Sequence, residues 1–276
     1  MRARSGIVSV AVTSVTGTYK DVADFSFTVE SWTDALSGPA RTFATANVPG
    51  NVETVKLSTS PTVKPGEIQI VGTVTGATKA AMLTSLRQLK GWAVRAVALK
   101  LLALDANTFV EVDQVGAPVV HFSPNGVHPA ARVTLTFQAL KPYWQSTSLS
   151  AVTFTGSATD MPIGEAPSRP VIRLTGAYTN PTVTYKNSAG STVGSFTLTV
   201  TLANAAHYVE IDCARRTIVH NTGSDADGIA LLTAGDFIAL DPADADTLTP
   251  DWGTLAYTVT AGTVSSATAT YRANYW

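Results

Sequence analysis

The chain has 276 residues, enough for two domains that each bury a core. Charged residues make up only 14% of it, the formal net charge is −1, and no run of Lys or Arg stands out, so it lacks the clustered cations of a nucleic-acid binder. A single cysteine excludes an internal disulfide and a four-cysteine zinc site.

The first segment, MRARSGIVSVAVTSV, imitates a signal peptide because two arginines precede an apolar stretch. Its apolar residues alternate with Ser and Thr, however, and no clear small-residue cleavage site follows. We therefore expect a first strand here. No apolar run approaches the roughly 20 residues that a membrane-spanning helix needs, so we expect no membrane insertion.

Three later segments of the first half also alternate between apolar and polar residues. They cover residues 25–32, 67–76 and 132–140. Period-two spacing gives a strand one apolar and one polar face. In the first segment, the residues expected to share a face are Phe25, Phe27, Val29 and Ser31.

One segment, ATKAAMLTSLRQLKGWA, has helical spacing. Thr78 is the expected N-cap and Gly91 the expected C-terminal stop. The apolar positions of this helix are Ala81, Met82, Leu86 and Leu89. The helix should pack on a sheet, and the next segment, VRAVALKLLALD, returns to strand.

A domain boundary is expected near residues 145–168, which are rich in Ser, Thr, Gly and Pro. The second half then holds many short strand-like runs, including HYVEIDC, RTIVHN and DFIAL, with turns such as NSAG and NTGSDADG between them. Many short strands favour an antiparallel sandwich. We predict two domains, residues 1–145 and 146–276.

No segment carries the pattern of a catalytic or cofactor site. Nothing resembles a nucleophile elbow, a phosphate loop or a dinucleotide fingerprint. Cys213 lies at the end of a strand-like run, where a buried hydrophobic role is the commoner one. We therefore predict no catalytic residue, no cofactor and no enzymatic activity.

Metal ligands are not expected either. The histidines show no paired HxH or HxxxH spacing; they are His121, His128, His207 and His220. DADG at Asp225–Gly228 resembles the start of a calcium loop, and DPADAD at 241–246 adds carboxylates. The match fails because position 5 is Ile229 and position 12 is Asp236 rather than Glu.

The order of these features resembles the distal tail proteins of siphophages. LTFQALKPYW, Leu135–Trp144, is similar to the Phe-bearing strand and Pro-Tyr-Trp-like corner that close the family's N-terminal domain. EAPSRPVIRLTGAYTNPTVTY resembles the start of its galectin-like second domain, and HYVEIDCARRTIVHN a later hairpin. Residues 1–20 depart from the family, which often opens with a Phe-rich strand.

The resemblance implies a mainly β fold: an N-terminal β-sandwich with one flanking α-helix and a C-terminal galectin-like antiparallel β-sandwich. It also implies a structural virion protein, assembled in the host cytoplasm, whose N-terminal domain forms a hexameric ring at the phage tail tip. The implied partners are further copies of the chain, the tail tube protein, the tail-tip hub protein, the tape-measure protein and receptor-binding proteins. The low charge suits surfaces covered by other subunits, and equally a β protein with a Thr/Ser/Ala-rich surface.

A carbohydrate-binding module, or another baseplate or surface adhesion subunit, is the alternative. A lectin site needs a stacking aromatic beside polar groups. The candidate sugar contacts are Tyr178, Tyr185 and Trp252. The helix and the Pro-Tyr-Trp corner favour the tail protein, since a lone lectin would need neither. A β-rich hydrolase is disfavoured by the missing motifs.

Overall fold

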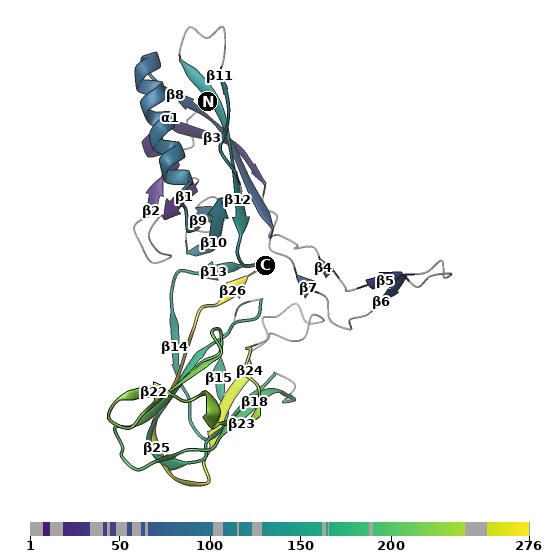
Figure 1. The fold of residues 1–276 in the computed structure, drawn as a ribbon, viewed down its shortest axis with the longest axis vertical. Coiled ribbons are helices and arrows are strands. Elements are labelled where there is room, and N and C mark those ends of the chain that lie inside the picture. Colours follow the sequence, from purple (N-terminus) through teal and green to yellow (C-terminus); the bar gives the residue numbers. More distant parts are fainter. Residues whose placement is uncertain are drawn as a thin grey trace. The chain divides into compact units, whose positions relative to one another are not determined.

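The computed structural model describes residues 8–11, 19–33, 41–42, 45–47, 54–56, 62–63, 66–101, 107–114, 116–122, 129–161, 164, 166–187, 190–240 and 253–275. The chain divides into two compact units, one ending at Thr147 and one beginning at Ser148. Within the described residues the fold is mainly β, with antiparallel sheets and one α-helix, which confirms the predicted mainly β fold class (Figure 1). No described helix is long and apolar enough to cross a membrane.

One antiparallel sheet organises the first unit. Its strand order is β2-β1-β9-β10-β12-β8-β3, with β11 also paired to β12 and β13 to β10. The bounds are β1 Val8–Ala11, β2 Tyr19–Asp21, β3 Phe27–Thr33, β8 Glu67–Thr75, β9 Ala98–Leu101, β10 Thr108–Gln114, β11 Val119–Phe122, β12 Ala130–Ala139 and β13 Trp144–Ser146. Two small hairpins pair β4 (Arg41–Thr42) with β7 (Thr62–Val63) and β5 (Thr45–Asn47) with β6 (Thr54–Lys56).

The pairing of β8 with β12 is the longest continuous register in this unit. It runs from Thr75 opposite Ala130 to Glu67 opposite Gln138. Because side chains alternate across a sheet, one face of both strands is apolar and buried and the other is polar. The buried face carries Ile68, Ile70, Val74, Ala131, Val133, Leu135 and Phe137.

Strand β3 alternates as predicted only up to Val29. A bulge between Val29 and Ser31 inserts Glu30 into the register with β8. An inserted residue moves all later side chains to the opposite face. Ser31 therefore leaves the apolar face on which we predicted it, and Trp32 takes the inner position opposite Ile70. Phe25 lies outside the strand, in the 3-10 helix η1 (Val22–Phe25).

Helix α1 (Lys79–Ala93) packs on β8 and β12 (Figure 1). Thr78 caps it as predicted, because its hydroxyl accepts a hydrogen bond from the Ala81 amide at 3.2 Å. The predicted stop at Gly91 is wrong: the helix continues to Ala93, whose buried side chain extends the inner face. The other buried helix residues are Met82, Leu86 and Leu89, whereas Ala81 is exposed.

The second unit contains two antiparallel sheets. The seven-stranded sheet has the order β14-β25-β16-β20-β21-β22, with β19 paired to β16. The five-stranded sheet has the order β15-β24-β17-β18-β23. Their bounds are β14 Ser150–Thr153, β15 Thr159–Met161, β16 Val171–Thr179, β17 Thr182–Lys186, β18 Thr192–Leu198, β19 Thr201–Leu202, β20 Tyr208–Asp212, β21 Thr217–Asn221, β22 Asp225–Asp227, β23 Leu232–Gly235, β24 Gly253–Thr258 and β25 Ala261–Tyr271.

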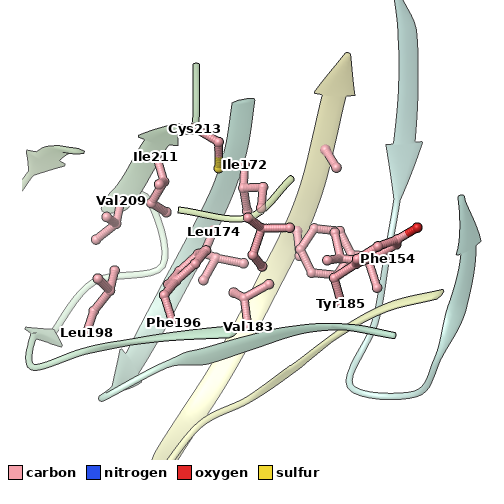
Figure 2. Packing of buried hydrophobic residues seen from close by; sticks show 14 of the residues in the cluster. Phe154, Ile172, Leu174, Val183, Tyr185, Phe196, Leu198, Val209, Ile211 and Cys213 are labelled. Atoms are coloured by element: carbon pink, nitrogen blue, oxygen red, sulfur yellow. The ribbon is translucent and has the colours of Figure 1, made fainter. Parts of the chain in front are cut away.

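The core of the second unit lies between these sheets. Alternate residues of β16 and β20, such as Ile172 and Ile211, meet alternate residues of β17 and β18, such as Val183 and Phe196 (Figure 2). The 3-10 helix η2 (Ile229–Leu231) precedes β23, and β26 (Asn274–Tyr275) follows β25. Two predictions fail locally: DFIAL forms no strand beyond a bridge from Leu240 to Ser168, and the predicted turn NTGSDADG contains β22.

Two glycines of the first unit should respond oppositely to alanine. A Cβ on Gly72 would overlap the Thr28 carbonyl oxygen and the Phe27 ring, whereas a Cβ on Gly91 meets nothing within 4 Å. Gly72→Ala should therefore destabilise the unit by about 1–3 kcal/mol through overpacking. Gly91→Ala should stabilise it by about 1 kcal/mol through helix propensity.

Both effects are measured as changes in the free energy of unfolding in urea. Tryptophan fluorescence follows the unfolding, in variants that keep tryptophan in one unit only. Equal stability of the Gly72→Ala variant and the unmodified chain would contradict the close packing of β3 on β8.

Candidate functional site

The two predicted sugar contacts in the described strands are core residues. Tyr178 of β16 is 1% exposed, and its hydroxyl donates a hydrogen bond to the Leu174 carbonyl oxygen at 3.0 Å. Burial raises the pKa of Tyr178. Tyr185 of β17 is 0% exposed (Figure 2), and its ring occupies the space where a Cβ on Gly253 would lie.

A stacking residue must present a ring face to the sugar. Since Tyr178 and Tyr185 are both enclosed, their predicted role as sugar contacts is wrong for this fold. The third candidate, Trp252, lies outside the described residues and stays a prediction.

Cys213 lies in the core of the second unit (Figure 2) and is 0% exposed. Burial, as the largest cause, raises the pKa of its thiol to about 12. Because the thiolate is the reactive form, burial makes Cys213 a poor nucleophile at neutral pH.

We expect Cys213 to resist alkylation by iodoacetamide in the folded chain from pH 7 to pH 10. An ordinary thiol would ionise within this range, but a pKa near 12 keeps Cys213 protonated throughout. The measurement is mass spectrometry after timed alkylation, with the urea-unfolded chain as the control that must react fully. Rapid labelling of the folded chain at pH 8 would contradict its burial.

The side chains considered as metal ligands do not come together among the described residues. In the described part of the chain, no three His, Cys, Asp or Glu residues cluster as metal ligands. His121 is exposed on β11, and His128 lies outside the described residues. His207 Nδ1 and His220 Nε2 are buried atoms without a hydrogen-bond partner among the described residues. Asp225 engages neighbouring side chains, and residues 241–246 lie outside the described ranges.

The side chains that do gather form a polar cluster on the outer face of the seven-stranded sheet. The Tyr208 hydroxyl donates to Asp225 Oδ1 at 2.7 Å, and Asn221 Nδ2 donates to the same oxygen at 2.5 Å. The Arg173 guanidinium lies 3.6 Å from the centre of the Tyr208 ring and 3.6 Å from Glu210 Oε2. This stacking takes up one face of the Tyr208 ring.

Hydrogen bonding within this cluster alters two pKa values. The pKa of Asp225 is lowered by two hydrogen bonds, the larger effect coming from Asn221 and the smaller from Tyr208. The hydrogen bond to Asp225 in turn raises the pKa of Tyr208. The cluster therefore favours the ionised form of Asp225 and the protonated form of Tyr208. Its polar groups satisfy one another, as expected of a solvated surface network.

In the first unit, the most distinctive surface is a pair of sheet edges. β11 pairs with β12 from Val119 opposite Thr134 to Phe122 opposite Ala131, and no other described strand pairs with β11. Val119 is 52% and Phe122 56% exposed. Among the described strands, β3 pairs only with β8, so its outer edge is also open.

The polar face of the strands between these edges carries little charge. Its central feature is the pair of Arg132 Nε and Glu30 Oε2 at 3.3 Å, and Glu30 also accepts a hydrogen bond from Thr73. Small uncharged side chains surround this pair; they include Thr28, Thr75, Thr134 and Thr136. Such a face offers no cationic track.

Comparison with solved structures places this architecture beside a phage protein. The crystal structure of the Dit protein of phage SPP1, described as a paradigm of the hub adsorption apparatus in phages that infect Gram-positive bacteria, matches with a TM-score of 0.68 and 16% sequence identity. The match covers 93% of this chain and 96% of that one, so both units are included. The chain has the Dit fold.

Two baseplate structures of phage P2, in the activated conformation with Ca and with Sr, are more distant. Each match covers 96% of this chain and 96% of the other, at 8% and 10% identity and TM-scores of 0.44 and 0.45. No family model matches the sequence, and no curated protein resembles it in sequence. The structural match bears out the resemblance to distal tail proteins that the order of the sequence motifs indicated.

The open edges and the polar cluster were both missed by the sequence analysis. The alternation of side chains along β20 could have located part of the cluster. Tyr208 is out of phase with the apolar Val209 and Ile211, which places it on the outer face. The same rule puts Tyr178 in phase with Leu174, on the inner face. No comparable signal in the sequence identifies which strands end a sheet.

Proposed function

We propose that the chain is a structural protein of a phage tail tip, a distal tail protein without enzymatic activity. The observation that carries this proposal is the Dit fold, matched over 93% of the chain and 96% of the SPP1 protein. A match of this extent covers both units in their order along the chain. Fold alone does not fix function, so the surface chemistry has to agree with it.

The surface agrees with an assembly role. A charged share of 14% lowers the cost of removing surface from water when subunits meet. Open strand edges with exposed apolar side chains mark surfaces that another chain covers. The described residues with perturbed pKa values are buried core groups, members of the Tyr208–Asp225 surface cluster, or Asp236, whose pKa is lowered mainly by its exposed hydrogen-bonded ion pair with Arg216.

In this role the first unit forms a ring, most simply a hexamer, that joins the tail tube protein to the tail-tip hub protein. The second unit projects outward toward receptor-binding proteins, and the lumen passes the tape-measure protein and DNA. A lumen with this function needs no dense cationic lining, which agrees with the absence of Lys/Arg runs from the sequence. The protein would be assembled in the host cytoplasm and reside in the virion.

Two measurements test the proposal. Immunogold labelling of purified virions should place the chain at the end of the tail distal to the head, and light scattering should give six times 28.8 kDa for the ring. Residues 1–147 expressed alone should retain the multimer, and residues 148–275 should be monomeric. Label along the whole tail or on the head, or absence of the chain from virions, would refute the tail-tip role.

Carbohydrate binding by the second unit is the alternative. The feature that favours it is the exposed cluster of Tyr208, Arg173 and Asp225, with Trp252 as a further aromatic candidate. Calorimetric titration with host cell-wall polysaccharide tests this function. Saturable heat that is lost in both Tyr208→Ala and Trp252→Ala would support it, and no heat with the unmodified chain would exclude it for that polysaccharide.

A further inference from the structure

We propose that one flank of helix α1 is a docking surface for an acidic amphipathic helix of a partner protein. This surface, the α1 flank, consists of Lys79, Leu83, Arg87, Lys90 and Val94. The proposal goes beyond the proposed function, because it rests on the described residues of the first unit and does not need the tail-tip role.

The sequence around α1 carries positive charge without any negative charge beside it. From Ile68 to Leu104 it contains five Lys or Arg and no Asp or Glu. Residues 1–147 hold thirteen cations against nine carboxylates, a net charge of +4, whereas residues 148–276 hold six against eleven, a net charge of −5. The excess positive charge of the first unit is therefore concentrated in and just after α1. The cations are spaced apart along the sequence, so they form no run of Lys or Arg.

The described carboxylates do not neutralise the cations of α1. The ion pairs among the described residues join Glu30, Glu111, Glu210, Asp212 and Asp236 to cations outside the helix. The first turn of α1 contains no acidic residue and begins with Lys79. A cation at this end opposes the helix macrodipole, which favours Asp or Glu there. A locally unfavourable choice of this kind is expected at functional sites.

Helical spacing gathers these cations beside two apolar side chains. At about 100° per residue, positions 79, 83, 87, 90 and 94 lie within about 80° of one another around the helix axis. Val94, the C-cap, keeps helical dihedral angles and is 60% exposed, and Leu83 is partly exposed. The α1 flank thus presents cationic and apolar groups together along about 22 Å of helix.

The other sides of α1 are already in contact with the first unit. Its buried face packs on β8 and β12 (Figure 1). The opposite flank carries Trp92, whose ring centre lies 6.0 Å from that of Phe25 in η1 and 5.8 Å from Lys20 Nζ. Among the described residues, the α1 flank is therefore the side of the helix that another protein can reach.

The mixture of charge and apolar surface favours a protein helix as the ligand. Intervals of four and three residues are those at which two helices pack side by side. A partner helix can place apolar side chains on Leu83 and Val94 and carboxylates opposite the cations. DNA would use the cations alone. An anionic membrane would need larger apolar side chains on the exposed face.

Charge reversal on the α1 flank separates docking from a structural role of the cations. Lys79→Glu combined with Arg87→Glu should leave the free energy of unfolding unchanged or raise it, because both side chains are exposed and Glu suits the first turn of a helix. The probe is a fluorescently labelled synthetic helix of about 18 residues, long enough to span the flank, with a stripe of Leu bordered by Glu. Its dissociation constant from the full chain, measured by fluorescence anisotropy, should rise about tenfold in the double variant.

Two further variants serve as controls. Lys186→Glu combined with Arg215→Glu changes the net charge by the same amount at exposed positions of the second unit, and it should leave the dissociation constant unchanged. Val94→Ser removes an exposed apolar contact without changing the charge. It should raise the dissociation constant of the helix about threefold and leave the binding of polyglutamate unaltered.

The outcomes decide the proposal independently of the proposed function. Equal weakening by both charge-reversed variants would indicate unspecific attraction and overturn the proposal. No binding of the probe to the unmodified chain, even at millimolar concentration, would also overturn it. Equal or tighter binding of polyglutamate, a DNA duplex or phosphatidylglycerol vesicles would reject the helix as the ligand. The position of the chain in virions, found by immunogold labelling, tests the tail-tip role whatever the probe does.

Discussion

The nine-residue pairing of β8 with β12 is the constraint on which the first unit depends. It fixes the phase of both strands, so Ile68, Ile70, Val133 and Leu135 fall on one side and seat α1. It also sets the level at which β3 and β11 attach to either flank. A slip of one residue would turn every apolar side chain of one strand toward water and unseat the helix.

The second unit reaches stability differently, through two sheets that share one core. Gly253 on the neighbouring strand β24 has no side chain, and the ring of Tyr185 fills the space that a Cβ at this position would occupy. The outer face of the seven-stranded sheet is organised by charge, with Arg173 stacked on Tyr208 and Asp225 held by two hydrogen bonds. Along the same strands, alternate residues therefore form either the packed interior or the polar outer face.

The features that depend on local sequence could be predicted from its periodicity. The mainly β class, the single helix and the Thr78 cap could be predicted because each depends on neighbouring residues. The bulge at Glu30 could not, since it depends on the register with β8, and the helix passes Gly91 because Ala93 gains burial on the sheet. Tyr178 and Tyr185 were candidate sugar contacts by residue type alone, although their phase with Leu174 and Val183 puts them inside. The open edges depend on the order of strands in space, which one sequence without its fold does not reveal.

The proposed ring has a consequence for errors in assembly. A head-to-tail contact would contain no stop of its own; only the rotation between copies would decide whether the series closes. A substitution that altered this angle, for instance by changing the twist at the Glu30 bulge, would leave each subunit folded and yet prevent closure. The product would then be an open helical fibre of well-folded subunits.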